Sequence, residues 1–541
     1  MPGTTGGRQP PLHAILAAAI GIAVLLATLP AGFVAGTSDY WRSPGLEGID
    51  GMAALTGLRY FLADVWRFPL LDIPNLGAPG TSAVYTDSIP LLAIAMKLLG
   101  IRDVNPYGWW VALSYVLTPV AAVRVARLIG VRSVAGACAV AIFAATLPVF
   151  QLRVMHATLT AQFLILVALE AYFRRAAGRP WRWLEALLPA FALGIHPYML
   201  AFCLAPLAAG AVSSCVRERT PRRAASAMLP LLAGLAAAAA LAVAIGIHSP
   251  HLGAEREWGN YSANLLSPFW PRFSAISAMP FDAVANPSQA DGCLWLGFGV
   301  AGLAFLAFVS LAVPENRAAL RRHRAIIVAA MACLAFAVTT RPSFGPWTFG
   351  FYPEPFAPVL EAFRASGRFA WVAAWLLVVG GAAMACRLPR GGAMLLALAL
   401  LQAYDTGPAR DEAFRSATGI RAQSLPHGQM GPLFADARKI EVHPPYDCIT
   451  TPIAHDVSIE IILLASETST PIDSARTARR PTDCQAAAAS GARPGSEPGT
   501  LRLFLDIGEP RTPDDARPPQ WTAQCRTFAV AGGGAVRACG G

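Results

Sequence analysis

The sequence predicts an all-α polytopic membrane protein with about eleven transmembrane helices, one re-entrant or half-depth helix and a small C-terminal α/β domain. Two observations support this fold class. Of the 541 residues, 55% are hydrophobic and only 14% are charged, whereas about 25% of the residues in a soluble domain are charged. Long apolar runs recur until residue 405, and the rest of the chain is polar and rich in proline. We therefore expect a membrane domain at 1–404 and an extracytoplasmic domain at 405–541.

The first apolar run, 12–34, is too long for a signal-peptide core, which has ~7–15 residues, and long enough to cross a membrane. We therefore expect it to remain as the first transmembrane helix. The run 88–100 is too short to span comfortably and is expected to lie at half depth on the outer side. The other runs expected to cross are 107–127, 134–150, 157–173, 184–196, 198–215, 225–247, 293–313, 324–340, 368–386 and 392–404.

Arginine clusters between these runs set the expected orientation. Short loops rich in Lys and Arg stay in the cytoplasm, and with a cytoplasmic N-terminus every cluster lies on that side. Topology therefore explains the net charge of +10, and no nucleic-acid partner is expected. The clusters are Arg124/Arg127/Arg132, Arg174/Arg175/Arg179/Arg182, Arg217/Arg219/Arg222/Arg223, Arg317/Arg321/Arg322/Arg324 and Arg387/Arg390. The segments left outside are 35–88, 153–156, 196–198, 248–292, 341–367 and the tail.

The tail is expected to form a small mixed α/β domain, with strands at 458–466 and 500–508. It contains four of the ten cysteines. An even number of cysteines outside the cytoplasm favours two disulfides, with three possible pairings. These cysteines are Cys448, Cys484, Cys525 and Cys539. The chain has no CxxC or Cys/His pattern, so no zinc site is predicted.

The first outer loop, 35–88, is the longest polar interval in the first half of the chain, with six carboxylates and three arginines between Asp39 and Asp87. Apolar residues at helical spacing predict an amphipathic helix over 51–64, with Asp50 at its N-terminus. Asp50 either caps this helix or presents a carboxylate to a cavity at the membrane surface. Asp87 has the same two interpretations, because a helix is expected to open at Pro90.

Four features of this loop together resemble the GT-C superfamily of multi-pass glycosyltransferases, which use polyprenyl-phosphate-linked sugars. They are Asp50, the helix 51–64, DVWRFP at 64–69 and DSIPLL at 87–92. Most of 12–405 also resembles an uncharacterised bacterial membrane family of about this length. The shared text is VYTDSIPLLA (84–93), HPY (196–198), SANLLSPFWP (262–271), FRASGRFAW (363–371) and LQAYD (401–405).

The GT-C resemblance implies transfer of a sugar from a polyprenyl-phosphate carrier to an envelope glycan or lipid acceptor, on the outer face of a bacterial inner membrane. Such transfer needs a base and a group that holds phosphate. Asp50 is the expected base, and Asp87 would orient the acceptor or share a metal. Arg364 and Arg368 lie four residues apart and are expected to form a phosphate clamp on one helical face. The alternative interpretation is that both side chains snorkel to the lipid head groups.

The remaining candidate substrate-binding residues are polar side chains expected near the outer ends of the helices. They are Arg153, His156, His196, Tyr85 and Asn264. A divalent cation is the alternative to arginines for holding the phosphate.

Two other functions compete with the transferase. A transporter or lipid flippase predicts ionisable groups near the bilayer midplane and repeated, interrupted helices, and the sequence has no internal repeat. A non-catalytic scaffold for envelope assembly would use the tail as a binding module. No Rossmann glycine fingerprint, P-loop or serine-hydrolase elbow is present, which argues against soluble nucleotide chemistry.

Overall fold

The structure, a computed structural model, describes residues 11–42, 49–218, 220–247, 257–277, 284–418, 423–449, 451–478, 484–492, 497–507, 522 and 525–540. Arg219 and parts of the expected outer loop 248–292 lie outside these ranges. Two compact units share the chain, and each is described by itself. Unit 1 comprises Met1–Ala31, Trp109–Ala239 and Leu252–Phe414, and unit 2 comprises Gly32–Gly108, Ala240–His251 and Arg415–Gly541.

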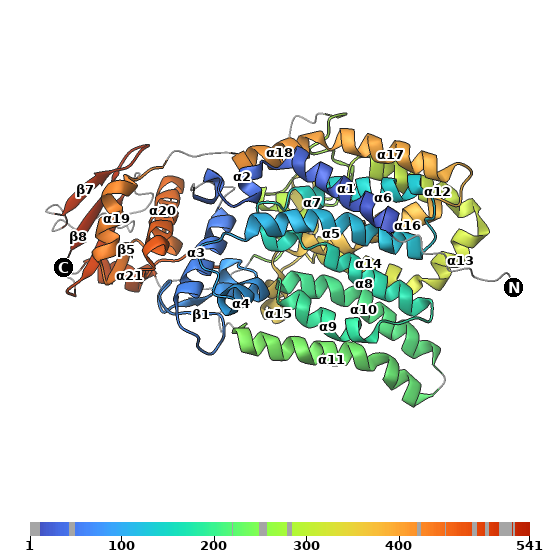
Figure 1. Ribbon diagram of the computed structural model, residues 1–541, viewed down its shortest axis with the longest axis horizontal. Helices are drawn as coiled ribbons and strands as arrows, with labels where there is room; N and C mark the ends of the chain where they lie inside the picture. Colours follow the sequence, from blue (N-terminus) through green and yellow to red (C-terminus); the bar gives the residue numbers. More distant parts are fainter. Residues whose placement is uncertain are drawn as a thin grey trace. The chain divides into compact units, whose positions relative to one another are not determined.

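Unit 1 is a bundle of helices (Figure 1). Within it, α10 packs against α8, α9 and α14, α12 packs against α16 and α17, and α6 packs against α1 and α17. The helices here and at the unit boundaries are α1 (Pro11–Thr28), α5 (Tyr107–Leu128), α6 (Val134–Thr146), α7 (Pro148–Gln151), α8 (Phe163–Ala176), α9 (Arg182–Leu193), α10 (Pro197–Arg217), α11 (Pro221–Ile245), α12 (Phe298–Val309), α13 (Pro314–Arg322), α14 (Arg324–Val338), α15 (Ala357–Leu360), α16 (Ala370–Ala385), α17 (Gly391–Asp405) and α18 (Gly407–Thr418).

Every apolar run expected to cross the membrane contains a helix, but fewer helices are long enough to cross. In the described ranges, five helices have the length and composition of a span: Tyr107–Leu128, Ala157–Ala176, Pro197–Arg217, Pro221–Ile245 and Ser366–Ala385. A sixth arises if Phe298–Ala312 and Pro314–Arg322, bent by 106°, count as one. Turns shorten the others: α6 ends before Pro148, and α1 ends at Thr28. The structure therefore supports a helical membrane protein with five or six candidate spans rather than about eleven.

Arginines from two of the predicted clusters meet at one end of the unit 1 helices. Arg217 donates to the carbonyl oxygen of Arg322 (3.4 Å), and Arg322 donates to that of Ala176 (2.8 Å). These residues belong to the C-terminal ends of α10, α13 and α8. The turns at 153–156 and 196–198 precede α8 and α10, so they lie at the opposite end of the same helices. Charged and polar turns are thus segregated between the two ends of unit 1.

Unit 2 contains a four-stranded sheet in the order β5–β6–β8–β7. β5 pairs in parallel with β6, and the β6–β8 and β8–β7 pairs are antiparallel. The strands are β5 (Lys439–His443), β6 (Thr500–Asp506), β7 (Arg526–Ala529) and β8 (Ala535–Gly540), with a small antiparallel pair of β1 (Asp72–Ile73) and β2 (Thr81–Ser82). The helices are α2 (Ala31–Val34), α3 (Ile49–Ala63), α4 (Pro90–Leu98), α19 (His427–Asp436), α20 (Pro452–Thr468) and α21 (Cys484–Ala492).

Among the local predictions for unit 2, one helix and one strand are confirmed, and a second strand is wrong. The helix expected at 51–64 is α3, and the strand expected at 500–508 is β6. The strand expected at 458–466 lies inside α20. A short apolar run fits a buried helix as well as a strand, and Pro452 at the first turn favours a helix start. The nine residues of α4 agree with the expectation that 88–100 is too short to span.

The first outer loop and the tail fold together, which differs from the expected boundary at residue 404. Met52 of α3 packs against Ile459 and Leu463 of α20. The hydroxyl of Tyr60 donates to the carbonyl oxygen of Thr470 over 2.5 Å, in a buried position. This shared core explains why segments about 400 residues apart belong to one compact unit.

The tail contains two disulfides, as predicted. Cys448 pairs with Cys484, and Cys525 pairs with Cys539. These bonds select one of the three pairings that the sequence left open. The first bond ties α21 to the turn before α20, and the second joins the start of β7 to β8.

Candidate functional site

Three turns of unit 1 bring two arginines and one aspartate together. Arg153 follows α7, Asp291 lies in the 3-10 helix η5 (Pro287–Gly292), and Arg368 lies in η9 (Ser366–Phe369). The approach of η5 and η9 requires glycine, because a Cβ on Gly367 would lie 2.6 Å from the Cα of Gly292. Gly367 therefore allows the close approach of the two segments that brings the next residue, Arg368, toward Asp291.

The three side chains form a bridged group, here named the arginine–aspartate cluster. Nη1 of Arg153 donates to Oδ1 of Asp291, and its Nη2 donates to the carbonyl oxygen of Asp291 at 3.0 Å. Nε of Arg368 donates to Oδ2 of Asp291 at 2.6 Å. The three side chains are only 13–14% exposed. Aromatic rings support both guanidinium groups: Trp371 lies 5.6 Å from Arg153, and Tyr198 lies 5.1 Å from Arg368.

The cluster carries an excess of positive charge. Burial by itself would raise the pKa of the Asp291 carboxyl group, but Arg153 and Arg368 lower this pKa to about 2. Asp291 is therefore ionised at neutral pH, and both guanidinium groups remain charged. Two cations and one anion leave one net positive charge at a poorly solvated position. Such a group favours an anionic ligand that bears several oxygen acceptors.

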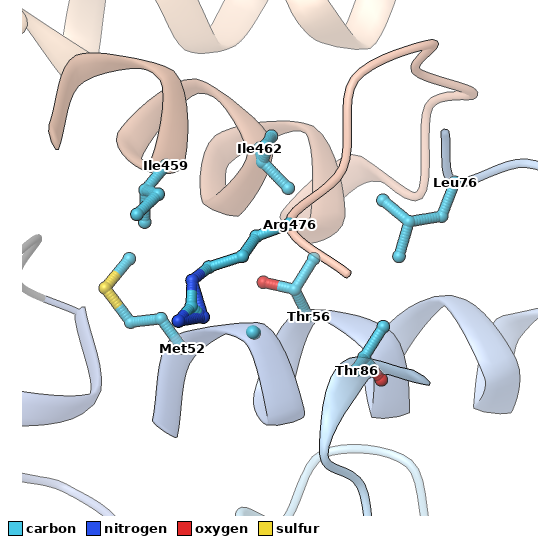
Figure 2. Close-up of a pocket in the computed structure, with 8 residues that line it drawn as sticks. Met52, Thr56, Leu76, Thr86, Ile459, Ile462 and Arg476 are labelled. Carbon is cyan, nitrogen blue, oxygen red and sulfur yellow. The ribbon is translucent and has the colours of Figure 1, made fainter. Parts of the chain in front are cut away.

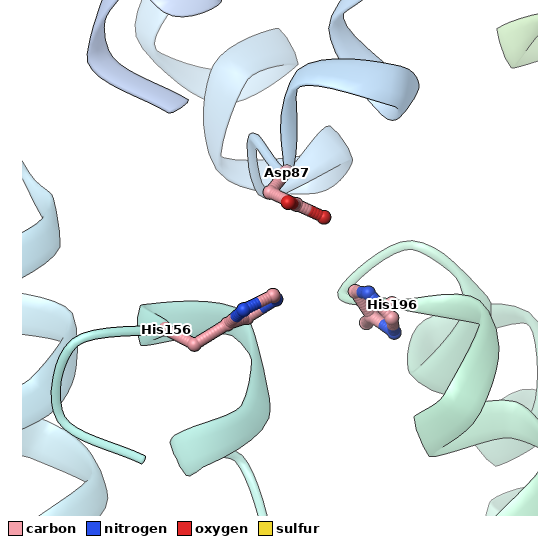
Figure 3. A group of neighbouring side chains, drawn as sticks. All are labelled: Asp87, His156 and His196. Atoms are coloured by element: carbon pink, nitrogen blue, oxygen red, sulfur yellow. The ribbon is translucent and has the colours of Figure 1, made fainter. Parts of the chain in front are cut away.

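Two predicted histidines lie close together in the same unit. The ring centroids of His156 and His196 are 5.9 Å apart, with the planes at 75° (Figure 3). Nδ1 of His196 accepts a hydrogen bond from the backbone N–H of Tyr198 (3.1 Å), which caps α10 and fixes the ring. Two imidazoles alone are too few ligands for a divalent cation. The divalent cation that the sequence suggests as an alternative for holding the phosphate therefore remains a prediction. Asp87, also drawn in Figure 3, belongs to unit 2 and is described with it.

The expected pairing of Arg364 with Arg368 is wrong. The two residues do not share a helix, because Arg364 ends η8 (Glu361–Phe363), Arg368 lies in η9, and α16 begins at Ala370. Arg364 instead donates to Glu257 at 2.5 Å, in a more exposed ion pair. Arg153, predicted only as one of several substrate-binding residues, is the arginine that meets Arg368 across Asp291. Asp291 itself was missed, because an aspartate in an irregular loop gives no periodic signal.

Asn264 has a structural role. Its side-chain nitrogen donates to Gln289 Oε1 (3.1 Å) and to the carbonyl oxygen of Gly345 (2.8 Å). Its side-chain oxygen accepts from the backbone N–H groups of Leu266 (3.0 Å) and Gly345 (3.0 Å). All four hydrogen-bonding positions of the amide are used within unit 1. The structure therefore gives no support to substrate binding by Asn264.

In unit 2, Asp87 does not cap α4. The N-cap is Ile89, and Asp87 follows the 3-10 helix η2 (Ala83–Thr86) in a left-handed conformation with φ of 59°. Aspartate is among the few residues besides glycine that tolerate this conformation. The carbonyl oxygen of Tyr85, in η2, accepts from the N–H of Ala478 at 2.8 Å, which ties this turn to the tail.

Asp50 lies in the first turn of α3 and forms an ion pair with Arg476. Nη1 of Arg476 donates to Oδ1 of Asp50 at 2.9 Å, and Nε donates to the hydroxyl of Tyr446 at 3.2 Å. The Asp50 side chain is 36% exposed. Arg476 was not predicted, since it stands 426 positions from Asp50 in a polar stretch without periodicity. The tail therefore contributes directly to the surroundings of the expected base.

A pocket opens beside this ion pair, between α3 and α20 (Figure 2). It encloses about 290 Å³, including open solvent. Most of its wall is apolar, and the guanidinium of Arg476 and the threonines supply polar groups. The pocket is lined by Met52, Ala53, Thr56, Leu76, Thr86, Ile459, Ile462 and Arg476.

The family model of a domain of unknown function, DUF6311, matches residues 18–407. The chain belongs to the DUF6311 family. No curated protein and no solved structure matches it. The DUF6311 match includes the arginine–aspartate cluster, the two histidines, Asp50 and Asp87, but it ends before α20 and Arg476. The DUF6311 region therefore contains the candidate phosphate-binding residues and the candidate catalytic base, Asp50. The tail adds Arg476, the partner of Asp50.

Proposed function

We propose that this protein is an integral membrane glycosyltransferase of GT-C-like layout. It moves a sugar from a polyprenyl-phosphate carrier to an envelope glycan or lipid acceptor on the extracytoplasmic face. The observation that carries this proposal is the arginine–aspartate cluster, which lies at the end of the unit 1 helices opposite the arginine-rich turns. A lipid-linked phosphate needs an apolar surface for its chain and a cationic group near one end of the helices, and unit 1 has both.

The cluster suits a phosphate because its charges are held in place before the ligand arrives. Asp291 bonds both guanidinium groups, and the aromatic rings of Trp371 and Tyr198 support them. A guanidinium offers parallel N–H donors that match two phosphate oxygens. Charges fixed by the fold stabilise a departing phosphate without reorganisation during the reaction. In this proposal Arg153 and Arg368 hold the phosphate of the donor and of the leaving polyprenyl phosphate.

Asp50 is the proposed base. The acceptor hydroxyl oxygen attacks the anomeric carbon, and its proton passes to the Asp50 carboxylate. The bond between that carbon and the phosphate oxygen breaks, and the polyprenyl phosphate leaves with the electron pair. Arg476 is a positioning residue, since it holds Oδ1 of Asp50. Asp87 is proposed to orient the acceptor, and no step depends on a metal.

The membrane orientation is part of the proposal. The gathering of arginines at one end of unit 1 supports a cytoplasmic location for that end. The two disulfides of the tail support an oxidising compartment, the periplasm or the outside of the cell. A cytoplasmic N-terminus and an outer C-terminal segment satisfy both observations.

The transporter alternative has one observation in its favour, the 106° bend between α12 and α13. The sequence of α13, PENRAALRR, is polar and carries three arginines. Such a helix is better suited to the membrane surface than to the bilayer interior. The bend therefore favours an interfacial elbow over an interrupted transport helix.

The test compares Asp50→Asn with Asp39→Asn in cells, at matched membrane expression. Asp39 is an exposed carboxylate of the same outer loop and serves as the control. We expect Asp50→Asn to remove one sugar mass from the extractable envelope glycan and to accumulate the polyprenyl-phosphate sugar, both read by mass spectrometry. An unchanged glycan in Asp50→Asn would refute the role of Asp50 as the base and would favour the transporter or the scaffold function.

A further inference from the structure

A two-stranded hairpin in unit 1 carries large aromatic side chains on its surface. It consists of β3 (Ser343–Phe344) and β4 (Trp347–Thr348), joined at Gly345 and Pro346. The irregular segment that follows β4 also carries exposed aromatic side chains. The exposed aromatic residues, here named the aromatic hairpin, are Phe344 (46% exposed), Trp347 (62%), Phe349 (57%) and Phe351 (66%).

The fold holds this hairpin firmly from beneath. Asn264 bonds both the N–H and the carbonyl of Gly345 at the turn. Gln289 donates to the hydroxyl of Ser343 at 2.8 Å, and both side chains are buried. The backbone N–H of Phe349 donates to the carbonyl of Pro342 at 2.9 Å. The aromatic rings are therefore presented by an ordered scaffold, and their exposure is a property of the folded unit.

The chemistry of the hairpin suits a lipid interface better than water. The sequence from Pro342 to Pro353, PSFGPWTFGFYP, contains no charged residue. A contiguous apolar patch of this kind marks an interaction surface. Tryptophan and other aromatic residues are enriched at the boundary between hydrocarbon and water, where an apolar ring and a polar edge are both accommodated.

The position of the hairpin favours the lipid bilayer as the partner that its aromatic side chains contact. It follows α14, whose Val328 and Met331 are exposed. α14 packs against α10 and α16, which belong to two of the candidate membrane spans. Exposed apolar side chains therefore lie both on α14, which packs beside candidate spans, and on the hairpin that follows it. The attachment of the hairpin to a helix beside candidate spans favours lipid over a soluble protein partner.

We propose that the aromatic hairpin inserts into the interfacial layer of the membrane at its end of unit 1. It anchors the loop 341–367 to the lipid surface, independently of any catalytic activity. The same loop leads through Arg364 into η9, so a hairpin fixed in the interface also fixes the depth of the segment that carries Arg368.

Fluorescence of Trp347 tests this proposal in the full-length protein. The protein is reconstituted in phosphatidylcholine vesicles that are unmodified, brominated close to the head group, or brominated near the end of the acyl chain. The Trp347 signal is the difference between the wild type and Trp347→Phe, a conservative change at an exposed site. Trp258→Phe gives the matched control, because Trp258 is buried inside the protein.

We expect the Trp347 signal to be lost in vesicles brominated close to the head group and to be retained more fully with deep bromines. The Trp258 signal should change in neither. A Trp347 signal that bromine leaves unchanged would overturn the proposal, whether water or protein covers the ring. Stronger loss with deep bromines than with shallow ones would equally overturn an interfacial position.

Discussion

Removing the Asp291 carboxylate tests the arginine–aspartate cluster most simply. Asp291→Asn keeps the size of the side chain and leaves Arg153 and Arg368 without their shared counter-charge. Because all three side chains are only 13–14% exposed, water screens this loss weakly. Removal of one partner from a buried ion pair costs about 3–5 kcal/mol. We expect a loss of this size in the free energy of unfolding.

The pH dependence of the free energy of unfolding gives a second value for the contribution of the Asp291 carboxylate. The folded-state pKa of Asp291 is about 2, against an ordinary value of 3.8. This difference corresponds to about 2 kcal/mol, present above the ordinary pKa and lost as the pH falls through about 2. The substitution is expected to cost more than this, because it also leaves two guanidinium groups facing each other. Wild type should therefore lose stability between about pH 4 and pH 2 relative to Asp291→Asn.

The assay is denaturant unfolding of the purified full-length protein in detergent micelles, followed by intrinsic fluorescence. Glu257→Gln is the matched control, since it removes the partner of Arg364 in an ion pair that is 25–28% exposed. A partly exposed pair of this kind contributes less than about 1 kcal/mol. Equal losses for Asp291→Asn and Glu257→Gln would refute the view that the cluster is buried and mutually dependent.

Three further predictions concern unit 2, each measured by unfolding against wild type. Gly57→Ala should lower the free energy of unfolding by about 1–3 kcal/mol, because the new Cβ would lie 1.9 Å from the hydroxyl oxygen of Thr86 in η2. Gly428→Ala is the control: its Cβ would meet nothing within 4 Å, so the free energy of unfolding should rise by up to about 1 kcal/mol. Burial raises the pKa of Asp473 to about 6, so stability should rise as the pH falls from about 7 to 4, and Asp473→Asn should abolish this dependence. Replacing Cys448 and Cys484 by serine opens a loop with a sequence separation of 36 and should cost about 4 kcal/mol on the chain-entropy model; a loss below about 1 kcal/mol would contradict the pairing.

The sequence predicted the elements of this fold better than their lengths. Apolar runs mark the helices because burial in protein and burial in lipid require the same side chains. The same property hides the difference between a long span and a short buried helix. The run 134–150 is one example, since α6 stops at Thr146 and α7 begins at Pro148. The buried run in α20 is another, because its apolar pattern alone does not exclude a strand.

The candidate site was predicted in part, and the reason lies in sequence separation. Arg153, His156, His196 and Arg368 were recognised because charged groups beside apolar runs are costly and conspicuous. Asp291 and Arg476 stand in irregular polar segments and were missed. The pairing of Arg364 with Arg368 assumed a helix that begins only at Ala370. Contacts between distant irregular segments depend on tertiary packing, which local periodicity does not encode.

Binding of a polyprenyl phosphate to the purified protein tests the central claim most directly. The two variants Arg368→Gln and Arg364→Gln remove the same charge at positions four residues apart, inside and outside the cluster. Native mass spectrometry of each variant with undecaprenyl phosphate, and with the corresponding uncharged alcohol, measures the contribution of the phosphate. The proposal predicts that Arg368→Gln loses the preference for the phosphate over the alcohol and that Arg364→Gln keeps it. If both variants keep this preference, the arginine–aspartate cluster does not bind the phosphate and the proposed transferase site is wrong.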